Sequence, residues 1–271
     1  MSVEAARARL EVLAECHEDR IPLDIAAALI AAEEQPGVDP DEVVAALDRL
    51  GAGLRLRYGA PLSEDLARLN LYLFEELGFT GDSASYDDPV NSFMDQVLAR
   101  KRGLPITLGV LMIEVARRAG LDLSGVGFPG HFLVRPRHAD PMFWVDPFNG
   151  GRVLTADRLR GRLDKMDLKG EDAMRRHCRP VSPRYVMVRW NNNLKGSWLR
   201  RGNVHGAIRA SERMLILAPN LLDERKDLGL MHAHIGHVDK AVHHLEGYLQ
   251  THPQSPDRDQ VEATLAQLKQ G

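Results

Sequence analysis

His131 and Asp146 are the residues whose types and spacing suggest catalytic chemistry. His131 stands in the segment "PGHFLV", and Asp146 follows fifteen residues later in "WVDP". If the two segments are paired strands, the two side chains can meet on one side of the sheet. A carboxylate that accepts a hydrogen bond from an imidazole fixes the tautomer of the ring and raises its basicity. The pair would therefore supply the base and the orienting group of a catalytic triad.

The nucleophile of such a triad belongs at the start of a buried helix, where the helix dipole stabilises a thiolate. The segment "RGLPITLGVLMIEVARRAGL" predicts that helix, with Pro105 at its first position and Gly120 after its end. Proline has no nucleophilic side chain. Cys16 lies in a predicted N-terminal helix and Cys178 in a linker after the strands, so neither cysteine is placed to replace the missing thiol.

Three further residues are weighed for this site. Thr107 carries the only hydroxyl in the first turn of the helix, so it is an alternative nucleophile, although such a residue more often bonds the local backbone. Asn91 and Pro105 are expected to line the cleft, and an Asn before a helix also suits a cap.

Five histidines in "HAHIGHVDKAVHH" leave a metal site as an alternative. In the repeat register described below they scatter around two helices, so we predict neither a metal nor a cofactor.

The elements that must position these residues are mostly helical. We expect helices in the first 80 residues, including one over 23–34, one that starts after Asp39 with Pro40 at its first position, and one that starts at Ser63 and stops at Gly78. A polar loop follows over 81–92, then helices over 93–101 and 105–119. The segments "LSGVGFPGHFLVRP" and "MFWVDPFNGG" predict an antiparallel pair of strands.

The C-terminal part contains an internal repeat with a period of 34 residues. Four pairs of residues share this offset: Gly202 and Gly236, Ala207 and Ala241, Leu215 and Leu249, and Pro219 and Pro253. A glycine at the turn, an alanine at the helix crossing and a proline after the second helix are typical of tetratricopeptide repeats. We expect paired antiparallel helices from residue 182 onward.

The composition is that of an ordinary globular chain. It has 271 residues, a net charge of −3 and two cysteines, which gives no indication of a nucleic-acid partner or of a disulfide framework. The N-terminus has no apolar run typical of a signal peptide, and no segment has 18 uninterrupted apolar residues. We therefore expect a cytoplasmic protein with no membrane partner.

Residues 91–151 resemble the transglutaminase-like fold, which is related to papain. In that pattern a cysteine opens the helix, a histidine begins one strand and an Asp-Pro ends the next. His131 and Asp146 match the last two positions, and Pro105 occupies the cysteine position. More closely, "NSFMDQVLARKRGLPITLGVLMIEVARRAGL", "GVGFPGHFLVR" and "DPFNGG" resemble the bacterial SirB-type family, also called transglutaminase-like core 2, with C-terminal tetratricopeptide repeats. This resemblance implies no settled activity.

These observations predict an α+β fold in two domains. Residues 1–180 would form a transglutaminase-like domain, with N-terminal helices over 1–80 and a core over 91–165 that holds a small antiparallel sheet. Residues 182–271 would form all-α repeats.

The leading functional hypothesis is a pseudoenzyme whose repeats bind a protein or peptide partner. The alternative is a hydrolase or acyl-transferase that uses His131 and Asp146 with Thr107 or an activated water. A small-molecule or peptide binding module in the old active-site cleft lies between these two.

Overall fold

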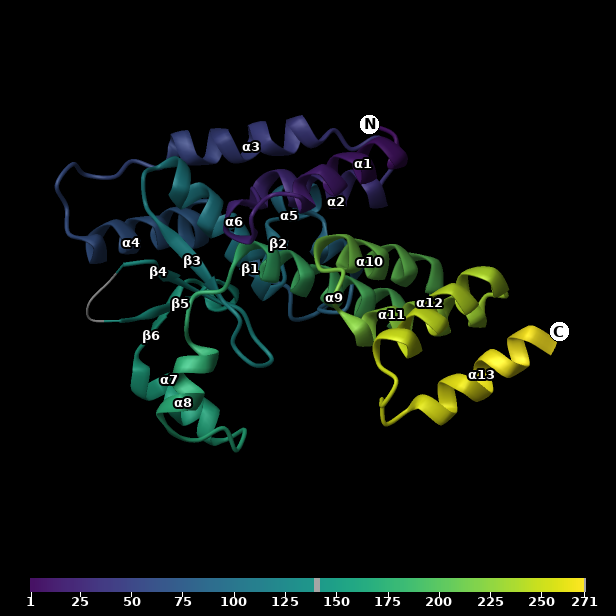
Figure 1. Cartoon of the computed structure of the whole chain (residues 1–271). Coiled ribbons are helices and arrows are strands. Elements are labelled where there is room, and N and C mark those ends of the chain that lie inside the picture. Colours follow the sequence, from purple (N-terminus) through teal and green to yellow (C-terminus); the bar gives the residue numbers. More distant parts are fainter. Residues whose placement is uncertain (139–141, 271) are drawn as a thin grey trace. The chain divides into compact units, whose positions relative to one another are not determined.

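The computed structural model describes residues 1–138 and 142–270 (Figure 1). Its backbone forms two compact units, Met1–Val186 and Met187–Gly271. The first unit combines helices with a small antiparallel sheet, and the second is helical. The predicted fold class is therefore confirmed. No helix among the described residues is both long enough and apolar enough to span a membrane.

The first unit begins with helices and then forms its sheet. Its elements are α1 (Val3–Ala14), η1 (Glu18–Arg20), α2 (Leu23–Glu34), α3 (Pro40–Gly53), α4 (Leu62–Asn70), the π-helical turn η2 (Leu71–Glu76), β1 (Thr80–Gly81), η3 (Pro89–Ser92), α5 (Met94–Arg100), β2 (Arg102–Gly103), α6 (Pro105–Arg118), β3 (Leu123–Val126), β4 (Leu133–Pro136), β5 (Trp144–Asp146), η4 (Pro147–Asn149), β6 (Arg152–Leu154), α7 (Ala156–Asp164) and α8 (Gly170–His177).

Helix α6 is the central element of this unit. It packs against α2 and α3 and against strands β3 and β4. Every residue from Pro105 to Ala116 is buried, so this helix is apolar on nearly all sides, as expected for a helix enclosed by other elements. Gly109 is required by this packing, because a Cβ atom there would lie 2.6 Å from the ring of Phe132.

The main sheet has the order β3-β4-β5-β6, and every neighbouring pair is antiparallel. The two predicted segments therefore lie in one antiparallel sheet, but the sheet has four strands where the sequence predicted a pair. Two left-handed glycines, Gly150 and Gly151, reverse the chain after β5 and return it as β6. The face opposite α6 is covered by α7 and α8, which pack Leu159 and Met174 against Trp144.

The N-terminal helices match the sequence in part. Helix α2 has the predicted bounds, and Asp39 caps α3 by accepting a hydrogen bond from the amide of Asp41. The prediction that Ser63 caps the next helix is wrong. Helix α4 already begins at Leu62, because the extended backbone of Pro61 takes the cap position.

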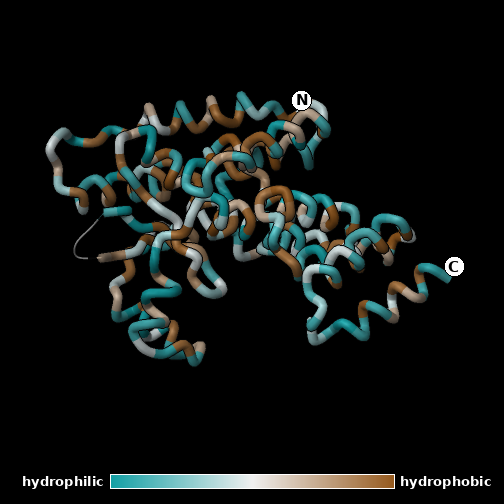
Figure 2. The backbone as a smooth tube through the Cα atoms, in the orientation of Figure 1, coloured by the Kyte–Doolittle hydropathy of each residue, from teal (hydrophilic) through white to brown (hydrophobic). Residues whose placement is uncertain are grey.

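The second unit consists of antiparallel helices. Helix α9 (Pro183–Arg200) crosses into it, followed by α10 (Val204–Leu217), α11 (Leu222–His234), α12 (Val238–Thr251) and α13 (Arg258–Gln270). Figure 2 shows apolar and polar residues alternating along α13, whose Val261 and Leu265 are buried one turn apart.

The repeat prediction is confirmed at the residues that carried it. Gly202 and Gly236 adopt positive φ angles of 69° and 75° in the turns before α10 and α12. Ala207 and Ala241 are fully buried, at 0% exposure each. Small side chains at these positions allow the paired helices to approach closely.

Candidate functional site

The side chains of His131 and Asp146 are in direct contact. The Nε2 atom of His131 lies 2.7 Å from Oδ1 of Asp146, a hydrogen-bonding distance. The Asp146 side chain is fully buried, whereas the His131 side chain is 18% exposed. The predicted contact is confirmed, and the carboxylate is the inner partner of the pair.

The position of His131 differs slightly from the prediction. Strand β4 begins at Leu133, so His131 lies two residues before it and not within it. Gly130 has a φ angle of 65°, and the amide of His131 donates to the carbonyl of Phe128 at 3.0 Å. A Pro-Gly turn thus aims the histidine before the strand starts.

The Asp146 carboxylate has additional partners that the sequence analysis did not identify. The amide side chain of Asn149 donates to Oδ2 at 2.9 Å, and its backbone N–H donates to Oδ1 at 3.3 Å. Nη1 of Arg162, from α7, lies 3.8 Å from Oδ2. Burial alone would raise the pKa of the Asp146 carboxyl, but the bonds from His131 and Asn149 outweigh it and hold that pKa below its ordinary value.

The role of Asn149 could have been recognised from the sequence. In "DPFN" an Asp followed by Pro resembles a helix cap, and Asp146 does cap the short helix η4. One carboxylate therefore both caps a turn and orients the histidine. Arg162 left no comparable local signal, since α7 was not predicted.

Aromatic rings border the histidine. The rings of His131 and Phe148 meet edge to face with centroids 6.1 Å apart, and Phe148 meets Tyr86 in the same way at 5.8 Å. Phe148 also lies against Gly81, where a Cβ atom would approach its ring to 2.6 Å. Gly81 in β1 pairs with Gly103 in β2, two residues before Pro105. This series of contacts connects the histidine to the head of α6.

Pro105 occupies the first position of α6, where the missing N–H has no cost. Thr107 is fully buried, and its hydroxyl accepts from the amide of Leu104 at 2.8 Å and donates to the carbonyl of Leu104 at 3.1 Å. Both bonds serve the helix start. The hydroxyl therefore has the local backbone role that was the alternative to a nucleophile.

Asn91 is fully buried within a polar network. Its amide nitrogen donates to the carbonyl of Ser85 at 2.7 Å, and its oxygen accepts from Arg100 at 3.0 Å. Arg100 also pairs with Asp82 at 3.0 Å. These bonds hold the loop over 82–91, so the interactions of Asn91 are structural.

Cys178 lies after the strands, as the sequence indicated, whereas the prediction that Cys16 lies in a helix is wrong, because α1 ends at Ala14. Cys178 follows α8, is buried, and its pKa is raised to about 11 because burial disfavours the thiolate. Cys16 is half-buried just after α1. A thiol with a raised pKa is a poor nucleophile at neutral pH, so Cys178 lacks the properties of a catalytic cysteine.

The histidines of the repeat unit lie closer together than expected. The ring of His232 stacks on those of His237 and His244, with centroids 5.6 and 5.7 Å apart, and His243 contacts His244 at 5.2 Å. The prediction that they scatter is wrong, because the turn at Gly236 folds α12 back beside α11. Within residues 1–138 and 142–270, no group of three or more His, Cys, Asp or Glu side chains is arranged to hold a metal.

Comparison with known proteins identifies both parts of the chain. Residues 41–192 match the family described as "Transglutaminase-like superfamily". The chain belongs to this superfamily. Residues 194–266 match a tetratricopeptide repeat family. These matches confirm the transglutaminase-like core and the repeats, whereas the narrower SirB-type assignment stays a prediction.

Relatives named UPF0162 protein match most of this chain. One from Xylella fastidiosa strain Temecula1 is 38% identical over 264 residues, which cover 94% of this chain and 93% of that protein. One from Pseudomonas aeruginosa is 31% identical and covers 72% of this chain and 71% of that protein. The chain is therefore also a member of the UPF0162 proteins.

A shorter similarity links the chain to a larger protein. F-box only protein 21 of Mus musculus is 41% identical over 101 residues, which are 34% of this chain but only 16% of that protein. No solved structure matches the chain.

Proposed function

We propose that this protein is a non-catalytic member of the transglutaminase-like superfamily that acts by binding a protein or peptide partner through its repeats. The observation that carries the proposal is Pro105 at the first position of α6, where the family pattern has its cysteine. His131 and Asp146 then form a retained pair without a thiol to activate. Removing the nucleophile from a unit that works as a triad removes nearly all of its catalytic contribution.

The alternative is a hydrolase or acyl-transferase in which His131 acts on Thr107 or on water. Thr107 would first have to release two backbone bonds to Leu104, which cap α6. Water activation by His131 requires no such change. Hydrolysis that depends on His131 but not on Thr107 would therefore favour this alternative over the proposal.

A Pro105→Cys variant tests whether the histidine pair retains the environment of an active site. Because Pro105 is buried, the rate of alkylation by iodoacetamide depends on access as well as on charge. The pH at which that rate reaches half its plateau reports the pKa of the new thiol independently of access. We expect this pKa to lie at least one unit below the ordinary value of about 8.5, since a helix N-terminus and an imidazole both favour the thiolate.

Two further variants complete this experiment. Pro105→Ala tests whether loss of the proline alone disturbs folding. Adding His131→Gln to Pro105→Cys should return the thiol pKa toward its ordinary value. A thiol in the single variant that titrates like a free cysteine would contradict the view that this site preserves an active-site frame.

The binding half of the proposal is tested at the surface of the repeats. Leu230 in α11 and Val238 in α12 are 38% and 41% exposed, so both large apolar side chains are accessible to a partner. We expect Leu230→Ser together with Val238→Ser to lower recovery of a specific partner at least tenfold in affinity purification from the native host. Val12→Ser in α1, at a position 64% exposed, is the matched control and should change nothing. Equal recovery by all three proteins would contradict a partner site on this surface.

A further inference from the structure

A cavity of about 450 Å³ lies within the first unit, away from the histidine pair. It is bordered by the start of α2, the last turns of α6, β3 and the segment over 181–186, and its walls are largely apolar, with Ile21, Leu23, Ile113, Leu121, Val181 and Val186. Its volume is within the usual range of small-molecule sites. Glu114 and Arg117 lie beside it, nine and twelve residues after Pro105, or about 14–18 Å further along the helix.

The hydrogen-bond register exposes one strand edge to this cavity. The carbonyl of Asp122 accepts from the amide of Arg137 at 3.0 Å, so the backbone polar groups of Asp122 and Ser124 face β4. In an antiparallel pair this direction alternates, so the N–H and C=O of Leu123 point to the opposite edge. Leu123 lines the cavity.

The segment over 180–182 runs antiparallel along that edge of β3 and ends one position before it would reach Leu123. The carbonyl of Gly125 accepts from the amide of Val181 at 2.9 Å. Continuing this antiparallel register would bring residue 183 beside Leu123, but Pro183 has no N–H and begins helix α9. Within the described part of the chain, no hydrogen bond reaches the N–H or C=O of Leu123 on this edge, and an unpaired strand edge is a template for an added strand.

A second polar group in the cavity wall lacks a partner. Ser124 lines the cavity and is only 4% exposed, and its hydroxyl has no hydrogen-bond partner among the described residues. A buried polar group without a partner is uncommon in folded proteins. Because the hydroxyl oxygen is itself inaccessible to solvent, it does not face the open cavity and gives no evidence of a ligand.

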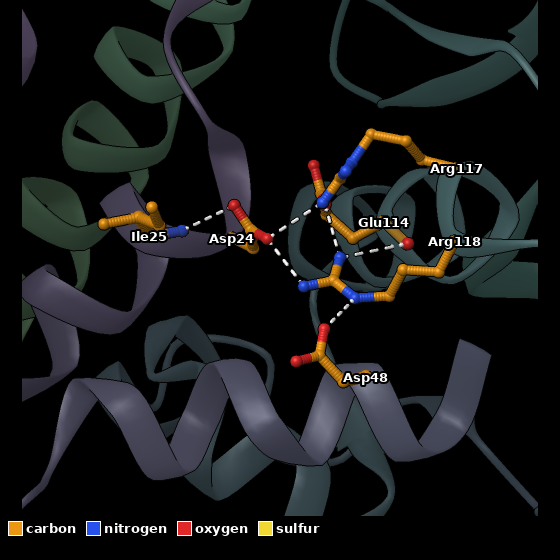
Figure 3. A network of polar contacts seen from close by, with 6 residues as sticks. All are labelled: Asp24, Ile25, Asp48, Glu114, Arg117 and Arg118. Atoms are coloured by element: carbon orange, nitrogen blue, oxygen red, sulfur yellow. Dashed lines mark hydrogen bonds and ion pairs between the residues drawn. The ribbon is translucent and has the colours of Figure 1, made fainter. Parts of the chain in front are cut away.

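The charges beside the cavity are already balanced. Asp24 and Glu114 are 4% and 3% exposed and are paired with Arg117 and Arg118 (Figure 3). Arg118 also reaches Asp48 of α3 at 2.6 Å, so the network joins three helices. Burial and the nearby Asp24 carboxylate raise the pKa of Glu114, while both arginines oppose that rise. These ion pairs hold the helices together, and they leave no unpaired charge in the network that a charged ligand would have to neutralise.

The rim likewise carries both signs of charge. Arg137 pairs with Asp122 at 3.1 Å, and Asp19 and Arg20 are both exposed. The site therefore has no net preference for an anion or a cation. Its selective features are the apolar walls and the backbone groups of Leu123.

From these features we propose that the cavity binds an extended peptide segment with an apolar side chain. One residue of the ligand would pair its N–H and C=O with the C=O and N–H of Leu123, in the place that residue 183 would take in a longer strand. Its side chain would fill the apolar cavity. This is strand addition to a sheet edge combined with a side-chain pocket. The proposal concerns a different site from the histidine pair and does not depend on the proposed function.

The test uses N-acetyl-leucine methylamide and the intact protein, followed by amide NMR shifts. We expect saturable binding with a dissociation constant on the order of 1 mM, as befits so small a ligand. The ester analogue, which replaces the leucine N–H by oxygen, should bind about fivefold more weakly because it loses one hydrogen bond. N-acetyl-serine methylamide should bind at least tenfold more weakly because it cannot fill the apolar cavity.

An Ile25→Trp variant locates the site. Ile25 lines the cavity and is half-buried, so a larger side chain there can occupy the cavity while the helix remains folded. We expect at least a tenfold loss of binding. Equal binding of amide and ester to the wild-type protein would overturn the strand pairing, and this outcome does not depend on how the variant folds. Absence of saturable binding to the wild type at 20-fold the expected constant, about 20 mM, would overturn the site itself.

Discussion

The two units bury imidazole rings in opposite ways. In the transglutaminase-like unit, His131 keeps 18% of its side chain exposed and bonds a fully buried carboxylate. In the repeat unit, His232 is only 1% exposed, and neither of its ring nitrogens has a hydrogen-bond partner among the described residues. The first ring is held by a specific polar partner, and the second is enclosed by other rings and apolar packing.

This difference distinguishes a histidine held by a specific hydrogen bond, His131, from a histidine held by packing alone, His232. A buried polar group is costly unless it is bonded, so a satisfied pair such as His131 and Asp146 indicates an arrangement that depends on its chemistry. The stack around His232 depends on the shape of the rings. The same residue type therefore has different consequences for mutation and for pH in the two units.

The largest expected effect is at Asp146. In an Asp146→Ala variant, His131 and both nitrogens of Asn149 lose their acceptor inside the protein. Because three hydrogen bonds to the fully buried carboxylate are lost, each contributing about 1 kcal/mol, we expect the free energy of unfolding to fall by about 3 kcal/mol. Urea denaturation measures this loss. Asp157→Ala is the control, since that side chain is 92% exposed, and it should change the value by less than about 0.5 kcal/mol.

Much of the first site was predictable because its signals are local. The Pro-Gly before His131 and the Pro after Asp146 fix backbone directions within one or two residues, so the two side chains could be paired from sequence. Arg162 could not be, because it reaches Asp146 from α7, whose position depends on packing against the far face of the sheet.

In the repeat unit, the helix pairs could be predicted from the sequence, but the contacts between the histidine rings could not. Its helix pairs were predictable from glycines, alanines and prolines at one offset. The stack of His232, His237 and His244 was not, because it depends on how far α12 is rotated about its own axis against α11. Periodicity predicts which residues are buried but does not predict which two rings meet.

The next largest expected effect is a fall in the free energy of unfolding as the pH is lowered. The pKa of His244 is lowered to about 4, mainly by burial and also by His243, His232, Arg225 and Lys240. The pKa of His232 is lowered by burial, Lys240 and His237, against an opposing effect of Glu212.

A histidine whose folded-state pKa is below the unfolded value of 6.5 binds fewer protons in the folded state. Its contribution to stability is complete above pH 6.5 and is lost as the pH falls toward 4. The lowered pKa of Asp146 acts only below its ordinary value of 3.8. Between pH 6.5 and 4.5 the repeat unit should therefore weaken before the His131 site does.

We expect the free energy of unfolding to fall by about 1–3 kcal/mol between pH 7.5 and pH 5, a range that allows for the partial exposure of His244. A His244→Leu variant should lose a large part of this dependence. The comparison of variant with wild type removes the effects of other groups, such as Glu114. An unchanged pH profile in the variant would show that His244 is not responsible.

The smallest expected effect distinguishes the two imidazoles most sharply. His232 has two buried ring nitrogens without partners among the described residues, so His232→Leu removes polar groups that contribute no bond and keeps an apolar side chain of similar size. At pH 7.5 we expect stability to be unchanged or raised by up to about 1 kcal/mol, because an apolar replacement leaves nothing unsatisfied. Urea denaturation with an unchanged m-value is the measurement, and Leu228→Ala in the same helix, which should cost 2 kcal/mol or more, is the control for sensitivity. A loss of more than about 2 kcal/mol in His232→Leu would mean that the ring bonds ordered water, and the contrast with the carboxylate-bound His131 would then disappear.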